Sequence, residues 1–210
     1  MPTATAPKGE VPKDMRPPKF VGNVGIDKEI FQSNHNFFRL INDDKEALRN
    51  RELMKLNAPY EVAYKTKTGK KLKVNIYADF SEPEFTRNFE VGKRIIDELN
   101  LNVYIRPHIN NRIASNIPNP EYLINGKIGD RKAVTGLNFR NALNKANNIQ
   151  KTEIVVIDLI DNPHSIEKVL SALRKNFKED SNYPLIKQII IVSKDRKTVK
   201  IYDRDEIKKG

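Results

Sequence analysis

Residues 119–132 read NPEYLINGKIGDRK, two short apolar stretches joined by an Asn-Gly pair. Asn-Gly between alternating apolar residues is a strong hairpin signal, because both central positions of a type I′ turn need positive φ. The sequence therefore predicts two neighbouring strands around Asn125-Gly126. Folding this hairpin brings Glu121 and Asp130 towards the same end, and Asp130 and Lys132, two positions apart, share one face of their strand.

Two carboxylates and a lysine in one small volume are typical of metal-dependent phosphodiester hydrolysis. Carboxylate oxygens bind Mg²⁺ or Mn²⁺, and the ion neutralises charge on the phosphate and lowers the pKa of a bound water. The lysine then orients that water or stabilises the developing negative charge. An ordinary surface hairpin with a solvated Asp and Lys is the alternative, and the spacing alone does not separate the two interpretations.

The composition favours a polyanionic partner. The chain has 210 residues, with 38 Lys and Arg against 27 Asp and Glu and a formal charge of +11, which favours nucleic acid through counterion release. Net positive charge also keeps a protein soluble without any such partner. Cysteine is absent, which excludes disulfides, Cys-based zinc sites and thiol catalysis. Without a long apolar run or a secretory signal, we expect a soluble chain with no membrane contact.

Composition and periodicity divide the chain into three expected parts. Residues 1–26 are rich in Pro and predict a flexible leader. Residues 27–80 predict an accessory module of two short helices and a β-hairpin. Residues 81–210 predict a nuclease-like domain.

Apolar periodicity gives the order of elements in that last part. The expected elements are a helix from Pro83 to Leu99, a strand at 103–105, the Asn-Gly hairpin, a helix at about 137–149, a strand at 154–159, a helix capped at Asn162-Pro163 and running to Phe177, and a final hairpin of 186–192 and 198–202. The fold class is therefore α/β, an α+β mixed sheet, with an αβββαβ core followed by αββ.

This order resembles the core of the PD-(D/E)xK nuclease superfamily. More closely, residues 84–202 resemble the C-terminal tRNase domain of the CdiA contact-dependent inhibition toxins and its relatives on phage head and other mobile-element proteins. The matching stretches are FEVGKRIIDELNLNVYI, NPEYLINGKIGDRK, NKANNIQKTEIVVIDL and IKQIIIVSKDRKTVKIY. The resemblance implies an endonuclease toxin that cuts RNA, above all tRNA, in the cytoplasm of a target cell, with Mg²⁺ or Mn²⁺ as cofactor and an acidic immunity protein as partner.

The resemblance also implies roles for particular residues. Glu90 would be the helix acid and the third metal ligand beside Glu121 and Asp130, and Lys132 would be the catalytic lysine. Two further polar residues fall where relatives have a polar pair on the following helix: Gln150 and Lys145. The chain departs from the family at Glu121, where relatives usually have Asp, and at Glu90, which lies off the apolar stripe of its helix. Glu82 and Glu84 are therefore alternative helix acids.

Two other functions remain open. Relatives have also been assigned to the barnase/EndoU/colicin/RelE type, which cleaves RNA without metal; the candidates for its acid, base and cation are His108, Lys132, Arg106 and Arg112. A non-catalytic nucleic-acid-binding component of a phage or mobile element is the other alternative. No residue separates RNA from DNA as substrate, because contacts to the 2′-hydroxyl are not readable from one sequence.

Several further side chains are candidates for contact with nucleic acid. Arg106, Arg112 and Lys145 lie near the expected cluster, and the final hairpin carries Lys194, Arg196 and Lys197. Tyrosine rings are able to stack on unpaired bases, although tyrosines on strands are more often core residues. The tyrosines in question are Tyr104, Tyr122 and Tyr183.

Overall fold

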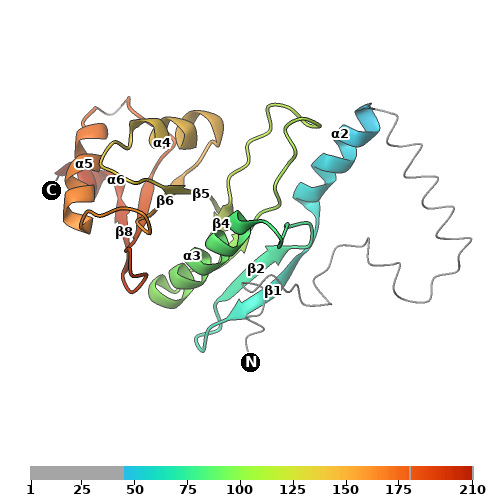
Figure 1. The fold of residues 1–210 in the computed structure, drawn as a ribbon, viewed down its shortest axis with the longest axis horizontal. Coiled ribbons are helices and arrows are strands. Elements are labelled where there is room, and N and C mark those ends of the chain that lie inside the picture. Colours follow the sequence, from blue (N-terminus) through green and yellow to red (C-terminus); the bar gives the residue numbers. More distant parts are fainter. Residues whose placement is uncertain (1–44, 180, 210) are drawn as a thin grey trace, which may run out of the picture.

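The computed structural model describes residues 45–179 and 181–209 (Figure 1). In chain order the elements are α2 (Lys45–Met54), the 3₁₀ helix η4 (Lys55–Asn57), β1 (Tyr60–Lys65), β2 (Lys71–Asn75), α3 (Pro83–Leu99), β3 (Val103–Ile105), β4 (Tyr122–Ile124), β5 (Lys127–Ala133), α4 (Arg140–Asn144), the π-helical segment η5 (Lys145–Ile149), β6 (Ile154–Asp158), α5 (Ile166–Asn176), β7 (Gln188–Val192), β8 (Val199–Asp203) and α6 (Arg204–Lys209). The expected leader and the first expected helix of the accessory module lie outside the described residues.

All strands of the described part form one eight-stranded mixed sheet, and their order in space is their order in the chain. β2 pairs with β3 in parallel, and β5, β6 and β7 are also mutually parallel. β1, β4 and β8 run antiparallel to their neighbours. The observed α3-β3-β4-β5-α4-β6 order, followed by α5-β7-β8, confirms the expected fold class. Since β2 pairs with β3, the hairpin of the expected accessory module continues this sheet; the division at residue 80 stays a prediction.

The longest helix, α3, begins and ends where the sequence places it. Pro83 occupies its first turn, and it ends at Asn100, whose φ of 55° is left-handed and whose N–H donates to the carbonyl of Ile96. Gly92 allows α3 to approach the sheet closely, because a Cβ there would meet Leu72 Cδ1 at 2.8 Å. The helix is therefore held against β2.

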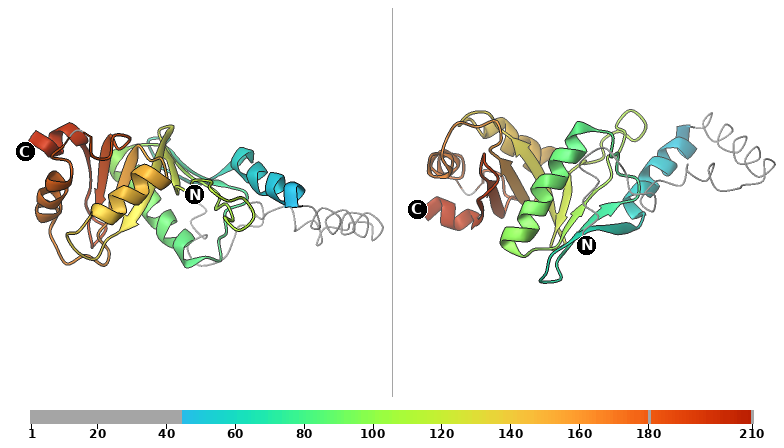
Figure 2. Two further views of the ribbon diagram at one scale, coloured as in Figure 1. Left: turned by 90° about the horizontal axis from the view of Figure 1, so that it is seen from above. Right: turned by 60° about the horizontal axis from the view of Figure 1, so that its bottom comes forward.

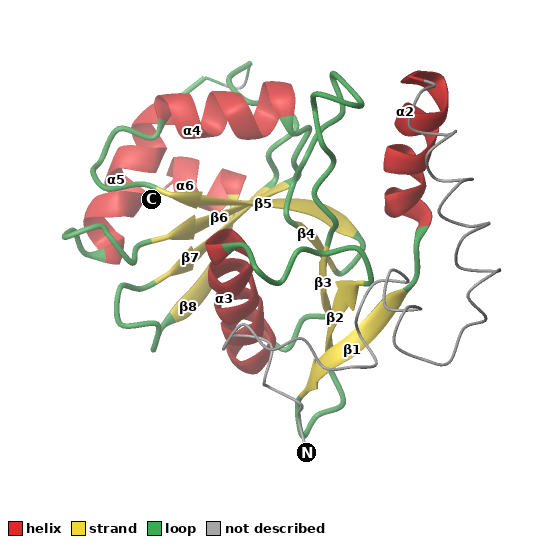
Figure 3. Ribbon diagram, turned by 45° about the vertical axis from the view of Figure 1, so that its right-hand side comes forward, coloured by secondary structure: helices red, strands yellow, loops and turns green. Residues whose placement is uncertain are grey.

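Each face of the sheet carries its own apolar layer. α3 packs on one face over a cluster that includes Leu72, Tyr122 and Val156. The segments α4, η5, α5 and α6 pack on the other face over a cluster that includes Val155 and Ile189. Figure 3 shows α4, α5 and α6 grouped beside β5–β8. The cluster beneath them contains no residue of β1–β4.

Three details differ from the expected elements. Ser165, not Asn162, is the N-cap of α5, and its hydroxyl accepts from the Lys168 amide at 3.4 Å. The helix expected at 137–149 is a short α-helix continued by π-helical turns. α6 was not expected.

In the two views of Figure 2, α2 projects from the end of the molecule where β1 and β2 lie. Among the described helices, none has the length and apolar character to cross a membrane.

Candidate functional site

The hairpin of β4 and β5 places Glu121 directly opposite Asp130. Tyr122 pairs with Gly129 in the antiparallel register, so the preceding residue on β4 faces the following residue on β5. The backbone N–H of Arg131 donates to Glu121 Oε2 at 2.8 Å. The carboxylate of Glu121 is therefore held over the end of β5, as the hairpin prediction requires.

Asp130 and Lys132 point to the same face and form an ion pair. The side chain of Asp130 is fully buried and that of Lys132 is 12% exposed. Asp130 Oδ1 lies in the protein interior without a hydrogen-bond partner. A buried carboxylate oxygen without a donor is costly, so this arrangement is suited to receive a cation or a proton.

Glu121 is the second carboxylate of the pair, and its ionised form is disfavoured. Burial, followed by the neighbouring carboxylate of Asp130, raises the pKa of Glu121 from its ordinary value of 4.5 to about 8, while Lys132 and the Arg131 amide act in the opposite direction. The negative charge of the pair is thus only partly compensated by Lys132. A bound cation would supply the missing compensation.

The donor set fits a hard divalent cation that keeps part of its water shell. Mg²⁺ is commonly held by one or two carboxylates, with waters and substrate phosphates completing its octahedron. Glu121 and Asp130 supply two such carboxylates. Within residues 45–179 and 181–209 no group of three or more His, Cys, Asp and Glu side chains is arranged to hold a metal ion. The residues therefore fit a two-carboxylate site with waters.

The cluster lies where β3 ends and β4 begins. β5 continues past this level, and β6 and β7 begin there, since Asp130 is level with Val155 and Ile189. A small pocket opens beside the end of β3 and is lined, among others, by Glu84, Arg106, His108, Asn119 and Glu121.

Gln150 holds the segment that leads into Glu121. Its Oε1 accepts a hydrogen bond from the backbone N–H of Asn119 at 2.6 Å, and its side chain is buried. Arg106 acts on the same segment, since its guanidinium donates to the Pro120 carbonyl at 3.1 Å and its amide donates to the Glu121 carbonyl at 2.8 Å. The structure thus gives Gln150 and Arg106 contacts that position the first carboxylate.

Sequence reasoning missed Arg131, which lies between Asp130 and Lys132 and points to the opposite face. Its guanidinium donates to Asn88 Oδ1 at 2.7 Å and to Asp158 Oδ2 at 2.8 Å, and it also pairs with Glu84. This buried cluster ties α3, β5 and β6 together behind the carboxylate pair. No spacing rule signals it, since its members come from distant parts of the sequence.

The structure does not bring Glu90 to the carboxylate pair. Glu90 lies on α3, which covers the Tyr122 face of the sheet, whereas Asp130 and Lys132 point to the other face. It therefore cannot complete the expected metal shell in this arrangement. Of the alternative helix acids, Glu84 is paired with Arg131, and both Glu82 and Glu84 line the pocket that Glu121 also lines.

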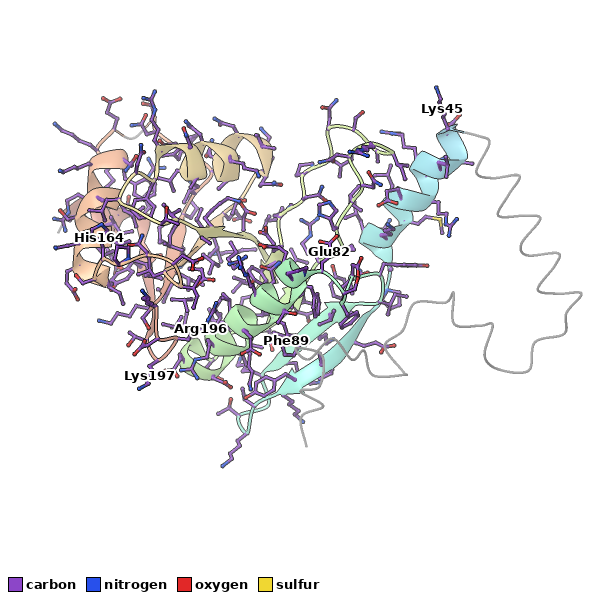
Figure 4. The ribbon with its side chains drawn as sticks, in the orientation of Figure 1. Lys45, Glu82, Phe89, His164, Arg196 and Lys197 are labelled. Atoms are coloured by element: carbon purple, nitrogen blue, oxygen red, sulfur yellow. The ribbon has the colours of Figure 1, made fainter. Side chains whose placement is uncertain are left out.

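The expected nucleic-acid-binding side chains differ in exposure. Arg112, Lys145, Lys194 and Lys197 are exposed, as is the catalytic candidate His108. Arg196 instead donates to Asp158 Oδ2 at 3.2 Å and so belongs to the buried ion cluster. Figure 4 shows Arg196 and Lys197 on the turn between β7 and β8 and Glu82 at the start of α3. Of the three tyrosines, Tyr122 is fully buried, Tyr104 is partly exposed on β3, and Tyr183 packs edge-to-face against Phe177.

Comparison with known proteins agrees with the resemblance described above. Residues 118–198 match the model of the family described as the contact-dependent growth inhibition CdiA C-terminal domain. This segment is therefore similar to the C-terminal domain of CdiA. No curated protein matches the chain.

One solved structure is also similar, the CdiA-CT/CdiI toxin and immunity complex from Burkholderia pseudomallei. It has 20% sequence identity and a TM-score of 0.42, and the match covers 56% of this chain and 82% of that one.

Proposed function

We propose that this chain is an endonuclease toxin domain that hydrolyses phosphodiester bonds in RNA, above all tRNA, with Mg²⁺ or Mn²⁺ held by Glu121 and Asp130. The observation that carries the proposal is the buried carboxylate of Asp130, which lies beside a second carboxylate and a lysine. An ordinary surface hairpin would leave these groups in water. The family match at residues 118–198 supports the same class of activity.

The residues of the chain have distinct roles in this reaction. A bound cation would neutralise the scissile phosphate and lower the pKa of a coordinated water. Lys132 places a positive charge beside Asp130, where it stabilises the negative charge that develops on the phosphate. The Arg131 amide orients Glu121, and Gln150 fixes the segment before it.

Cleavage of total tRNA by the purified protein tests this proposal. We expect cleavage in Mg²⁺ that is lost in EDTA, and at least a hundredfold loss in Asp130→Asn and Lys132→Met with unchanged circular dichroism. Lys127→Met is the matched control, because Lys127 lies on the same strand but at its other, exposed end. Full activity in Asp130→Asn would overturn the assignment. Parallel reactions with DNA determine which nucleic acid is the substrate.

A metal-free ribonuclease is the second candidate, and the pocket beside the end of β3 favours it. His108, Arg106 and Glu121 line this pocket together, which places a base or acid, a cation and a carboxyl group within one small space. This function predicts cleavage that persists in EDTA and is lost in His108→Ala. Salt-sensitive RNA binding without any cleavage product, in either condition, would instead favour the non-catalytic alternative.

An immunity protein and a site of action are also part of the proposal. Toxins of contact-dependent inhibition act inside a target cell, and the producing cell needs an inhibitor of its own toxin. We therefore propose a cognate immunity partner and action in the cytoplasm of the target cell. Co-expression with candidate inhibitors encoded by neighbouring genes tests both the partner and its effect. The expected results are co-purification of the two proteins and loss of tRNA cleavage.

A further inference from the structure

The half of the sheet formed by β1–β4 has one face that no described helix of the α4–α6 group covers. Register places Val62, Lys73, Tyr104, Leu123 and Ile128 in one row across this face. Val62 is 44% exposed, and the other four are partly exposed. Ile128 and Asp130 are two residues apart on β5, so this row lies on the same face as Asp130, about 7 Å along the strands.

The row has the chemistry that binds unpaired nucleotides. Tyr104 and Tyr60 are in edge-to-face contact, with ring centroids 5.5 Å apart. Lys73 Nζ lies 5.3 Å from the centroid of the Tyr104 ring. Aromatic rings on a sheet surface stack with bases, and lysines beside them contact the phosphates.

The charges on this face complement RNA. Lys65 lies opposite Lys71 in the register of β1 and β2. Both lysines are exposed and share the face with Lys73. The one acidic residue within β1–β4, Glu61, pairs with Val74 and therefore points to the α3 face. A single-stranded polyanion is thus favoured over an acidic protein, because the face offers stacking rings as well as cations.

The face leads directly to the carboxylate pair. Arg106, two residues after Tyr104, interacts electrostatically with both Tyr60 and Glu121. The next row along the strands contains Arg106, Glu121 and Asp130. A strand of nucleotides on Tyr60 and Tyr104 would therefore present its neighbouring phosphate at Arg106 and Glu121, which are the partly exposed members of that row.

We propose that this face, defined by Tyr60, Val62, Lys73, Tyr104 and Leu123, binds an unpaired segment of the RNA substrate next to the cleavage site. The inference rests on the proposed function, since it assigns the docking surface of that same site. It also specifies the substrate class: RNA with unpaired nucleotides, such as a loop or an end, rather than a continuous duplex.

Binding of a labelled 2′-O-methyl oligouridylate by the full chain in EDTA tests the proposal, because neither cleavage mechanism is able to cut this probe under these conditions. We expect Tyr104→Leu to weaken binding by roughly five- to a hundredfold, while Tyr104→Phe binds like the wild type. Lys73→Met should lower the slope of log K against log salt by about 0.7.

The chain provides a matched control on its other face. Lys93 Nζ lies 5.0 Å from the centroid of the Tyr64 ring, and Tyr64 contacts α3. Tyr64→Leu and Lys93→Met should therefore leave binding unchanged. Unaltered binding in Tyr104→Leu, an equal loss in Tyr64→Leu, or equally tight binding of duplex RNA would overturn the docking surface. Because binding is measured without cleavage, absence of any nuclease activity would refute the proposed function while leaving the binding result intact.

Discussion

Replacing Glu121 with Gln should change how the stability of the protein depends on pH. The pKa of Glu121 is about 8 in the folded protein, against an ordinary value of 4.5. The folded state therefore binds the proton more tightly than the unfolded state does. Its contribution to stability is fully present below about pH 4.5 and is lost as pH rises towards and through 8.

The pKa change of Glu121 sets an upper limit on this pH-dependent change in the free energy of unfolding. Each tenfold change in a dissociation constant corresponds to about 1.4 kcal/mol. A rise from 4.5 to about 8 thus amounts to at most about 5 kcal/mol, and sharing of the proton with Asp130 reduces it. The amide that replaces the carboxyl group cannot ionise, so Glu121→Gln should match the wild type near pH 5 and be more stable than the wild type near pH 9.

Urea denaturation in EDTA, followed by circular dichroism at several pH values, measures this difference. The exposed Asp205, changed to Asn, is a control that should keep the wild-type pH dependence. Adding Mg²⁺ at high pH should restore stability to the wild type by mass action, and much less to Glu121→Gln. A wild-type protein whose stability is flat or rises between pH 5 and 9, or a variant with the same slope, would refute this account of the carboxylate pair.

Three further substitutions test the packing around the site, each by urea denaturation at neutral pH. Arg131→Met should cost about 3 kcal/mol, because Arg196 is then the one cationic partner of buried Asp158 among the described residues; a loss below about 1 kcal/mol would contradict the structural role of this ion cluster. Gly92→Ala should cost roughly 1 to 3 kcal/mol, since the added Cβ meets Leu72 at 2.8 Å, and an unchanged stability would mean that α3 is not held so closely. Ser165→Ala should cost about 0.5 to 1 kcal/mol through loss of the α5 cap, whereas no cost would place the cap elsewhere.

The hairpin and its three charged groups are predictable because their rules are local. Asn125 and Gly126 have φ values of 47° and 82°, which is the conformation that selects Asn-Gly in a type I′ turn. The register then follows from the turn, and alternation along β5 puts Asp130 and Lys132 on one face. No long-range information is needed for this part of the site.

The position of Glu90 and the role of Arg131 depend on long-range packing. α3 lies on the face opposite Asp130, and Gly92 fixes its close approach to β2; periodicity identifies the apolar stripe of a helix but not the sheet face that the stripe covers. Arg131 reaches Asn88 and Asp158, which lie 43 and 27 positions away in the sequence. Such contacts appear only once the strand order is known.

The face of β1–β4 that no described helix of the α4–α6 group covers was also beyond local rules. β1 and β2 were readable as a hairpin, but the parallel pairing of β2 with β3 joins two strands that are separated in the sequence by the whole of α3. That pairing places Lys73 beside Tyr104 and extends the face of Asp130 by two strands.

Direct titration of Mn²⁺ into the protein, followed by electron paramagnetic resonance of the free ion, tests the central claim that Glu121 and Asp130 form a cation site. The account predicts one bound Mn²⁺ per wild-type chain at pH 8, competition by Mg²⁺, and loss of this binding in Asp130→Asn but not in Lys127→Met. Undiminished binding in Asp130→Asn, or no binding to the wild type, would contradict it.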